Sequence, residues 1–114
     1  MIPTELNQLP EVQQRNALLA IALGETPFIH NENLCIGEQS WHSSLTGGKF
    51  KPEEDGALMW RLVCELRNFY SLQEYNSFAF SELFFACEST HKLIAAYIAA
   101  DPKGLIKKWR KENE

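Results

Sequence analysis

The chain has 114 residues, of which 45% are hydrophobic and 23% charged, and its formal net charge is −4. This length predicts a single domain with one hydrophobic core. No run of about 18 apolar residues exists, which excludes a membrane-spanning helix. No basic residue precedes Arg15, which argues against a secretory signal peptide. The cysteines Cys35, Cys64 and Cys87 are odd in number and not closely spaced, so they predict reduced thiols in a cytoplasmic protein.

The charge is unevenly distributed along the chain. Residues 1–101 carry six basic and 13 acidic side chains, a net −7, whereas residues 102–114 carry five basic and two acidic side chains, a net +3. An acidic body repels a phosphate backbone, so the composition disfavours broad nucleic-acid binding. The short basic tail remains able to make a local contact with an anionic partner.

Two segments have the apolar periodicity and end signals of amphipathic helices. Residues 10–23 begin with Pro10 and end before Gly24, a common stop signal. Residues 52–67 begin with a proline followed by three acidic residues, which suit the positive end of a helix dipole. In this second segment Arg61 and Glu65 are spaced as an ion pair on one face. The opposite face is an apolar stripe of Met59, Leu62, Val63 and Leu66.

Residues 25–51 are the least regular part of the chain and are rich in glycine, serine, threonine and asparagine. An irregular segment of this length in a compact domain is expected to be partly ordered or functional. Asn33–Ile36 predicts a short strand. Apolar side chains are expected to hold the segment to the body at Phe28, Ile29, Trp41 and Phe50.

Residues 69–87 are rich in aromatic side chains on both sides of the dipeptide Asn76–Ser77. This pattern predicts a β-hairpin over about residues 70–86, with a helix starting at Ser81 as the alternative. Both faces of the second strand are apolar near Leu83 to Phe85. The sheet is therefore expected either to be covered by helices on both sides or to bury one face in a homodimer.

Two further helices are expected at the end of the chain. Ser89 or Thr90 is a suitable cap for a helix that continues to Ala100. Asp101 and Pro102 end that helix and, as N-cap and first position of the next, predict a basic C-terminal helix over residues 102–112. The predicted fold is therefore one α+β domain over residues 1–114, with a small antiparallel sheet packed against three to four helices.

From about residue 24 to residue 100, this order resembles the small phage proteins of the ABA-sandwich family. The matching stretches are 20–24, 57–67 with an internal Trp60, 71–80, and the alanine-rich 86–96. The chain departs from that pattern in its Phe-rich second strand and its basic tail. The resemblance carries no established activity; it implies a bacteriophage or prophage accessory protein.

Catalytic and metal-binding alternatives are less well supported by the spacing of the candidate residues. A metal site would use His30, Cys35 and His42, with Cys87 or His91, but no two of these form a close ligand pair. A cysteine nucleophile would need Cys87 and His91 in contact, whereas Cys64 falls in the apolar helix stripe and is expected to be inert. No cofactor motif is present, so no cofactor is predicted.

The sequence therefore favours a non-enzymatic interaction protein that binds and inhibits a host protein, such as a defence or replication component. A nucleic-acid regulator acting through the basic tail is the first alternative, and a small metal- or cysteine-dependent enzyme is the second. Binding to a membrane is not expected. The predicted contact surfaces are an acidic patch, an irregular loop and the tail: Glu53, Glu54 and Asp55; Trp41 to Lys49; and Lys107, Lys108, Trp109, Arg110 and Lys111.

Overall fold

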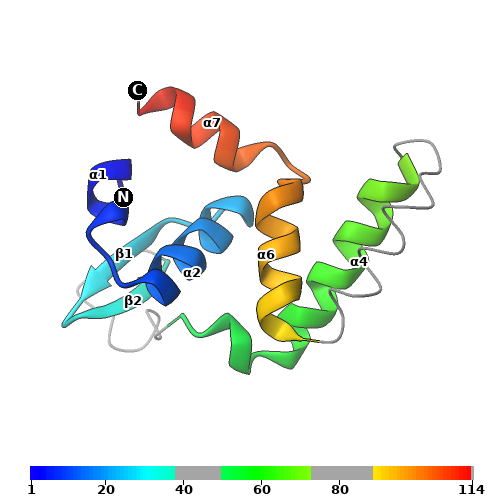
Figure 1. Cartoon of the computed structure of the whole chain (residues 1–114), viewed down its shortest axis with the longest axis horizontal. Helices are drawn as coiled ribbons and strands as arrows, with labels where there is room; N and C mark the ends of the chain where they lie inside the picture. The colour runs from blue at the N-terminus through cyan, green and yellow to red at the C-terminus, as the bar shows by residue number, and fades with distance from the viewer. Residues whose placement is uncertain (38–49, 73–88, 114) are drawn as a thin grey trace.

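The computed structural model describes residues 1–37, 50–72 and 89–113, and within them the fold is α+β, as predicted. In chain order the elements are α1 (Pro3–Asn7), α2 (Glu11–Ala22), β1 (Pro27–His30), β2 (Asn33–Ile36), the 3-10 turn η1 (Pro52–Glu54), α4 (Gly56–Leu72), α6 (Thr90–Ala100) and α7 (Leu105–Glu112). A small antiparallel hairpin lies at one end of the molecule against α2, while α6 and α4 lie on the other side of α2, and both termini are on the same side of the molecule (Figure 1).

Helix α2 confirms the predicted N-terminal helix, although Pro10 precedes its first turn rather than lying within it. The helix ends in a Schellman motif, in which the Glu25 N–H donates to the Ala20 carbonyl at 2.9 Å and the Gly24 N–H donates to the Ile21 carbonyl at 3.0 Å. Gly24 has φ +88°, a conformation that glycine adopts without steric cost. The stop signal in the sequence therefore reflects a real backbone requirement.

The short strand predicted at Asn33–Ile36 is confirmed as β2, and its partner β1 was not predicted. The two strands pair from Pro27 opposite Ile36 to His30 opposite Asn33. Only Asn31 and Glu32 connect them, with φ of 50° and 64°, as in a type I′ turn. The outer edge of β2 is occupied in part, because the Phe50 N–H donates to the Leu34 carbonyl at 2.7 Å. The irregular region is thus partly ordered.

The predicted helix over residues 52–67 differs from α4 at both ends. Pro52 begins a 3-10 turn, and Asp55 is extended, with its carboxylate accepting the Leu58 N–H at 3.0 Å. Asp55 thereby caps α4, which starts one residue later. At the other end, α4 continues to Leu72, so Tyr70 is helical rather than the start of a strand. The rest of the predicted hairpin, residues 73–88, lies outside the described residues.

Asp101 makes the corner between α6 and α7. Helix α6 begins near the predicted position, but Ser89 forms no side-chain capping hydrogen bond. Asp101 has φ 44°, and its carboxylate reaches forward to accept the N–H groups of Ile106 and Lys107, each at 3.1 Å. Since these N–H groups belong to the first turn of α7, the basic helix starts at Leu105 and not at Pro102.

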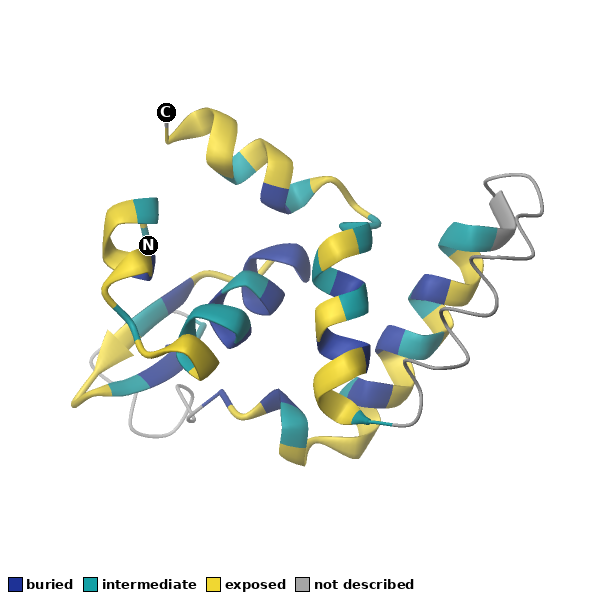
Figure 2. Ribbon diagram, in the orientation of Figure 1, coloured by how far each residue is buried: buried dark blue, intermediate teal, exposed yellow. Residues whose placement is uncertain are grey.

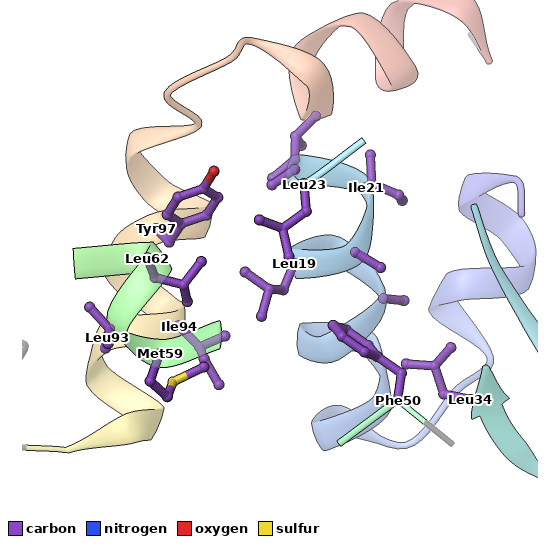
Figure 3. Close-up of a cluster of buried hydrophobic side chains, with 14 of the residues drawn as sticks. Leu19, Ile21, Leu23, Leu34, Phe50, Met59, Leu62, Leu93, Ile94 and Tyr97 are labelled. Atoms are coloured by element: carbon purple, nitrogen blue, oxygen red, sulfur yellow. The ribbon is translucent and has the colours of Figure 1, made fainter. Parts of the chain in front are cut away.

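The core lies between α2, α4 and α6 (Figure 3). Leu19 and Leu23 of α2 face Ile94 and Tyr97 of α6, and Leu62 of α4 completes the layer. The C-terminal half of α2 is enclosed, as its uniformly apolar sequence predicts, whereas α7 exposes most of its length (Figure 2). The predicted apolar stripe of α4 also faces the core, through Met59, Leu62, Val63 and Leu66.

Candidate functional site

Helix α7 is attached to the body along one side. Ile106 is 5% exposed. Leu105 lies against the residue that follows the end of α2, since a Cβ added to Gly24 would be 3.6 Å from the Leu105 Cδ1. Trp109 is half-buried, and its indole N–H donates to the Met1 carbonyl at 2.8 Å. Trp109 therefore docks α7 onto the N-terminal region. Its polar and apolar parts both have partners within the chain, and its predicted contact with a partner protein remains a prediction.

Three cations of α7 line a groove. Lys107, Arg110 and Lys111 are exposed, and their spacing of three and four residues places them on one face. The groove between this face and the end of α6 has a volume of about 720 Å³. Its lining combines the three cations with Ile98, Ala99, Asp101 and Ile106. The groove therefore has an apolar part and a basic part. We call Ile98, Ala99 and Ile106 its floor, and Lys107, Arg110 and Lys111 its rim.

The three rim cations have no ion-pair partner among the described residues. Asp101, the acidic residue in the groove lining, is already engaged with the first turn of α7 through both carboxylate oxygens. By contrast, Lys108 pairs with Glu112 at 3.9 Å on α7, and Lys103 pairs with Glu65 at 3.2 Å. Within the predicted tail surface, the structure thus separates Lys108 from the three cations that surround the groove.

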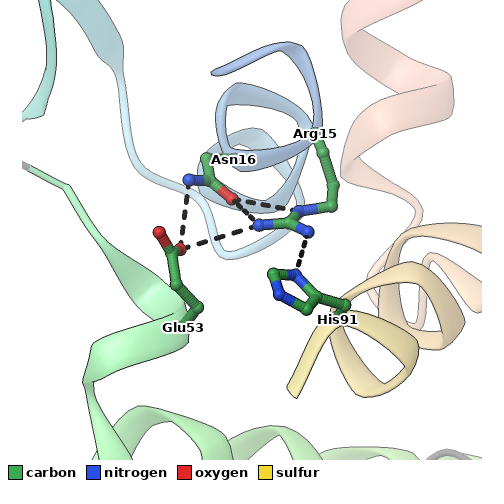
Figure 4. Close-up of polar contacts among 4 residues, drawn as sticks. All are labelled: Arg15, Asn16, Glu53 and His91. Carbon is green, nitrogen blue, oxygen red and sulfur yellow. Dashed lines mark hydrogen bonds and ion pairs between the residues drawn. The ribbon is translucent and has the colours of Figure 1, made fainter. Parts of the chain in front are cut away.

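The predicted acidic surface does not form as one patch. Glu53 is half-buried and accepts the Asn16 side-chain N–H at 3.2 Å, while the Arg15 guanidinium lies 3.7 Å from the same carboxylate oxygen (Figure 4). Arg15 also donates to His91 Nδ1 and to the Asn16 side-chain oxygen Oδ1. Glu53 therefore belongs to a structural network that joins α2, η1 and α6.

The other two acids of that predicted patch, Glu54 and Asp55, are exposed, and Asp55 is engaged in capping α4. They line a second cleft, of about 510 Å³, which mixes Glu25 with Lys51 and Arg61. This cleft has no single sign of charge. None of the residues that line this cleft belongs to α7, so the predicted acidic and basic surfaces do not meet there. Trp41 and Lys49 lie outside the described residues.

A part-buried hydrogen bond joins α4 to α6. The Tyr97 hydroxyl donates to Glu65 Oε2 at 2.7 Å. Burial alone would raise the pKa of Glu65, but the hydrogen bonds from Tyr97 and Lys103 and the charges of Lys103 and Arg61 together lower it. Burial, followed by the interaction with Glu65, raises the pKa of Tyr97. The predicted Arg61–Glu65 pair is confirmed at 3.6 Å.

The described residues contain no group of three or more histidine, cysteine or acidic side chains arranged to hold a metal. Cys35 is buried and its thiol lies 3.7 Å from the Asn33 carbonyl, as expected for a core cysteine. Cys64 is exposed, so its assignment to the apolar stripe is wrong: it lies one position beyond Val63, on the solvent side. His42 and Cys87 lie outside the described residues, which leaves their contacts with His30 and His91 as predictions.

The sequence predicted Asp101 as the cap of a helix beginning at Pro102; in the structure Asp101 does cap the last helix, but that helix starts after Gly104, at Leu105. The contribution of Ile98 and Ala99 to a groove was not predicted. Gly104 has φ +67° and immediately precedes the helix. The groove had no signal in the sequence, because it depends on the angle between α6 and α7.

Comparisons with protein-family models, with curated proteins and with solved structures return no match. The phage ABA-sandwich resemblance therefore rests on the sequence pattern alone. Among the helices that the structure describes, none combines the length and apolar character needed to cross a bilayer.

Proposed function

We propose that this chain is a non-enzymatic protein-binding module that holds an acidic protein partner against α7. The observation that carries the proposal is the set of three exposed cations, Lys107, Arg110 and Lys111, which have no ion-pair partner among the described residues. Carboxylates of a partner would supply the missing counter-charges. The host-directed inhibitory role expected from the sequence is the biological form of this proposal.

The way in which α7 is held supports a binding role. The helix is capped by Asp101 and docked through Ile106 and Trp109, so its cations project from an ordered surface. A preorganised surface avoids much of the entropic cost of ordering a segment on binding. A complementary acidic surface would also associate faster at low salt, since opposite charges steer the encounter.

The test is affinity purification of the full chain from bacterial lysates, using wild type beside two variants. In the rim variant, Lys107, Arg110 and Lys111 are each replaced by Glu. In the control, Lys108→Glu alters a cation on the same helix that already pairs with Glu112. We expect one protein to be retained in stoichiometric amount by wild type and by the control, and lost from the rim variant. Equal retention by all three proteins contradicts the proposal.

The nucleic-acid alternative is examined with the same variants. Binding of DNA or RNA that falls steeply with salt, and is lost in the rim variant, would assign the cations to phosphates instead. The net −7 of residues 1–101 works against that outcome, because the duplex backbone would be repelled by most of the protein surface.

A further inference from the structure

We propose that the groove between α6 and α7 binds an acidic amphipathic segment of the partner, with one apolar side chain of that segment inserted between the two helices. This inference rests on the proposed protein-binding function and specifies the chemistry of the partner. The juxtaposition that carries it is a groove lined both by apolar side chains and by three cations that lack a counter-charge among the described residues.

The floor determines which kind of anion fits. Ile98 and Ala99 from α6 and Ile106 from α7 line the groove, and none of them offers a side-chain hydrogen bond. Phosphate groups can satisfy only the rim, and in a nucleic acid the floor would be left to a sugar or a base. A peptide that carries both carboxylates and an aliphatic or aromatic side chain satisfies the floor and the rim together.

The rim determines the sign and the arrangement of the partner's charges. Lys107 begins the cationic face, and Arg110 and Lys111 follow it one turn later. Carboxylates spaced by a turn of helix, on both sides of a single apolar residue, would meet these cations in sequence. Arg110 can bind a carboxylate with two hydrogen bonds, which adds geometric selectivity.

Ala99 offers a way to test the floor without changing any charge. It is exposed and lines the groove, so the larger side chain of Ala99→Phe would occupy the space proposed for the partner's apolar side chain. Ala95 is one turn earlier on the same helix, is also exposed and does not line the groove. Ala95→Phe is therefore the matched control, with the same added side chain at a neutral position.

The experiment measures fluorescence anisotropy of labelled probes with the full-length protein. The first probe is a glutamate-rich peptide with a central Leu-Phe pair, and the second replaces that pair with Ala-Ala. The third is single-stranded oligothymidylate of equal charge. We expect the Leu-Phe peptide to bind most tightly, and its affinity to fall about tenfold in the Ala-Ala peptide, since each ~1.4 kcal/mol of lost apolar burial costs a factor of ten.

The variants give the remaining outcomes. Ala99→Phe should weaken the Leu-Phe peptide by about tenfold, while Ala95→Phe and Lys108→Glu change its affinity by less than about threefold. Equal affinities of the two peptides, oligothymidylate binding as tightly as the Leu-Phe peptide, or equal effects of the two Phe variants would each overturn the inference. A wild-type dimer that Ala99→Phe converts to monomer would also overturn it, by showing that a second copy occupies the groove.

Failure of this inference is distinguishable from failure of the proposed function. A cellular partner lost from the rim variant but retained by Ala99→Phe would overturn the anchored peptide and leave the protein-binding role standing. A partner retained equally by the rim variant would overturn the proposal that the α7 cations hold it.

Discussion

Asp101 is the residue on which the position of the basic helix depends, so its substitutions should be graded in a defined order. It lies in the left-handed region, with φ 44° and ψ 61°, and its carboxylate accepts two N–H groups from the first turn of α7. Asp101 therefore has two separable properties: it tolerates this backbone conformation, and it caps α7. The variants Asp101→Asn, Asp101→Gly and Asp101→Ala remove them selectively.

The magnitudes follow from those two properties. Asn tolerates the left-handed region and keeps one acceptor oxygen, so Asp101→Asn should lower the free energy of unfolding by only about 0.5 kcal/mol. Gly tolerates the conformation but loses the cap, which costs about 1 kcal/mol. Ala loses the cap and also pays roughly 1–2 kcal/mol for a positive φ, so Asp101→Ala should cost about 2–3 kcal/mol.

Urea unfolding followed by circular dichroism measures these differences, provided that the slope of free energy against urea is unchanged. Hydrogen exchange at Leu105–Glu112 shows whether α7 alone has loosened. The expected order of stability is wild type, Asn, Gly and then Ala. If Ala proves as stable as Asn, the assignment of Asp101 as a strained forward cap is wrong, whatever the effect on binding.

Three further predictions concern the supporting structure. Glu32→Gly should stabilise the protein by about 0.5–1 kcal/mol in urea unfolding, because φ 64° in a two-residue hairpin turn favours glycine; a loss of stability would contradict the turn assignment. Asn16→Ala should cost about 1–3 kcal/mol in the same assay, since this 3% exposed side chain joins Arg15 to Glu53, and a cost below about 0.5 kcal/mol would show that the network adds little. Tyr97→Phe should cost about 1–2 kcal/mol near neutral pH. Since the pKa of Glu65 is lowered on folding, its contribution is present above its ordinary value of 4.5 and is lost as the pH falls below it. Tyr97→Phe should therefore reduce the acid sensitivity of unfolding. Because the pKa of Tyr97 is raised above 10, its contribution is lost only at strongly alkaline pH, and its phenolate absorbance should appear together with unfolding.

The parts of the fold that could be predicted are those governed by local periodicity. Helix α2, the apolar stripe of α4 and the body of α6 have repeating apolar residues that determine which side faces the core. Helix ends were less predictable, because several residues can serve as a cap. Pro52 is typical of a helix start, but α4 begins after Asp55, because the Asp55 carboxylate accepts the Leu58 N–H. The strand β1 was missed although it is as long as β2, because it begins with Pro27, and a proline argues against a strand.

The candidate site could be predicted in composition but not in geometry. The excess of lysine and arginine in residues 102–114 is visible in the sequence. Which cations would be left without partners was not visible. Lys103 and Lys108 find Glu65 and Glu112, and the first of these pairs depends on a fold that brings α4 to the start of α7. The sequence also did not show that the Glu53 carboxylate, predicted to lie in a contact surface, would be engaged within the chain by Arg15 and Asn16.

The docking of α7 changes what the basic tail can do. A free tail of this composition would bind any polyanion, because it could adapt its cations to any spacing at an entropic cost paid on each encounter. A helix held at Ile106 and Trp109 fixes both the spacing of its cations and their position above the α6 floor. Fixed geometry favours the partner whose charges and apolar groups match it, and penalises anions that can satisfy the rim alone. Under the proposed function, the same +3 of charge would favour selective binding with α7 docked, and a variant that loosens α7 would bind less selectively. The Asp101 series tests this directly: loosening α7 should narrow the difference in affinity between the Leu-Phe peptide and oligothymidylate.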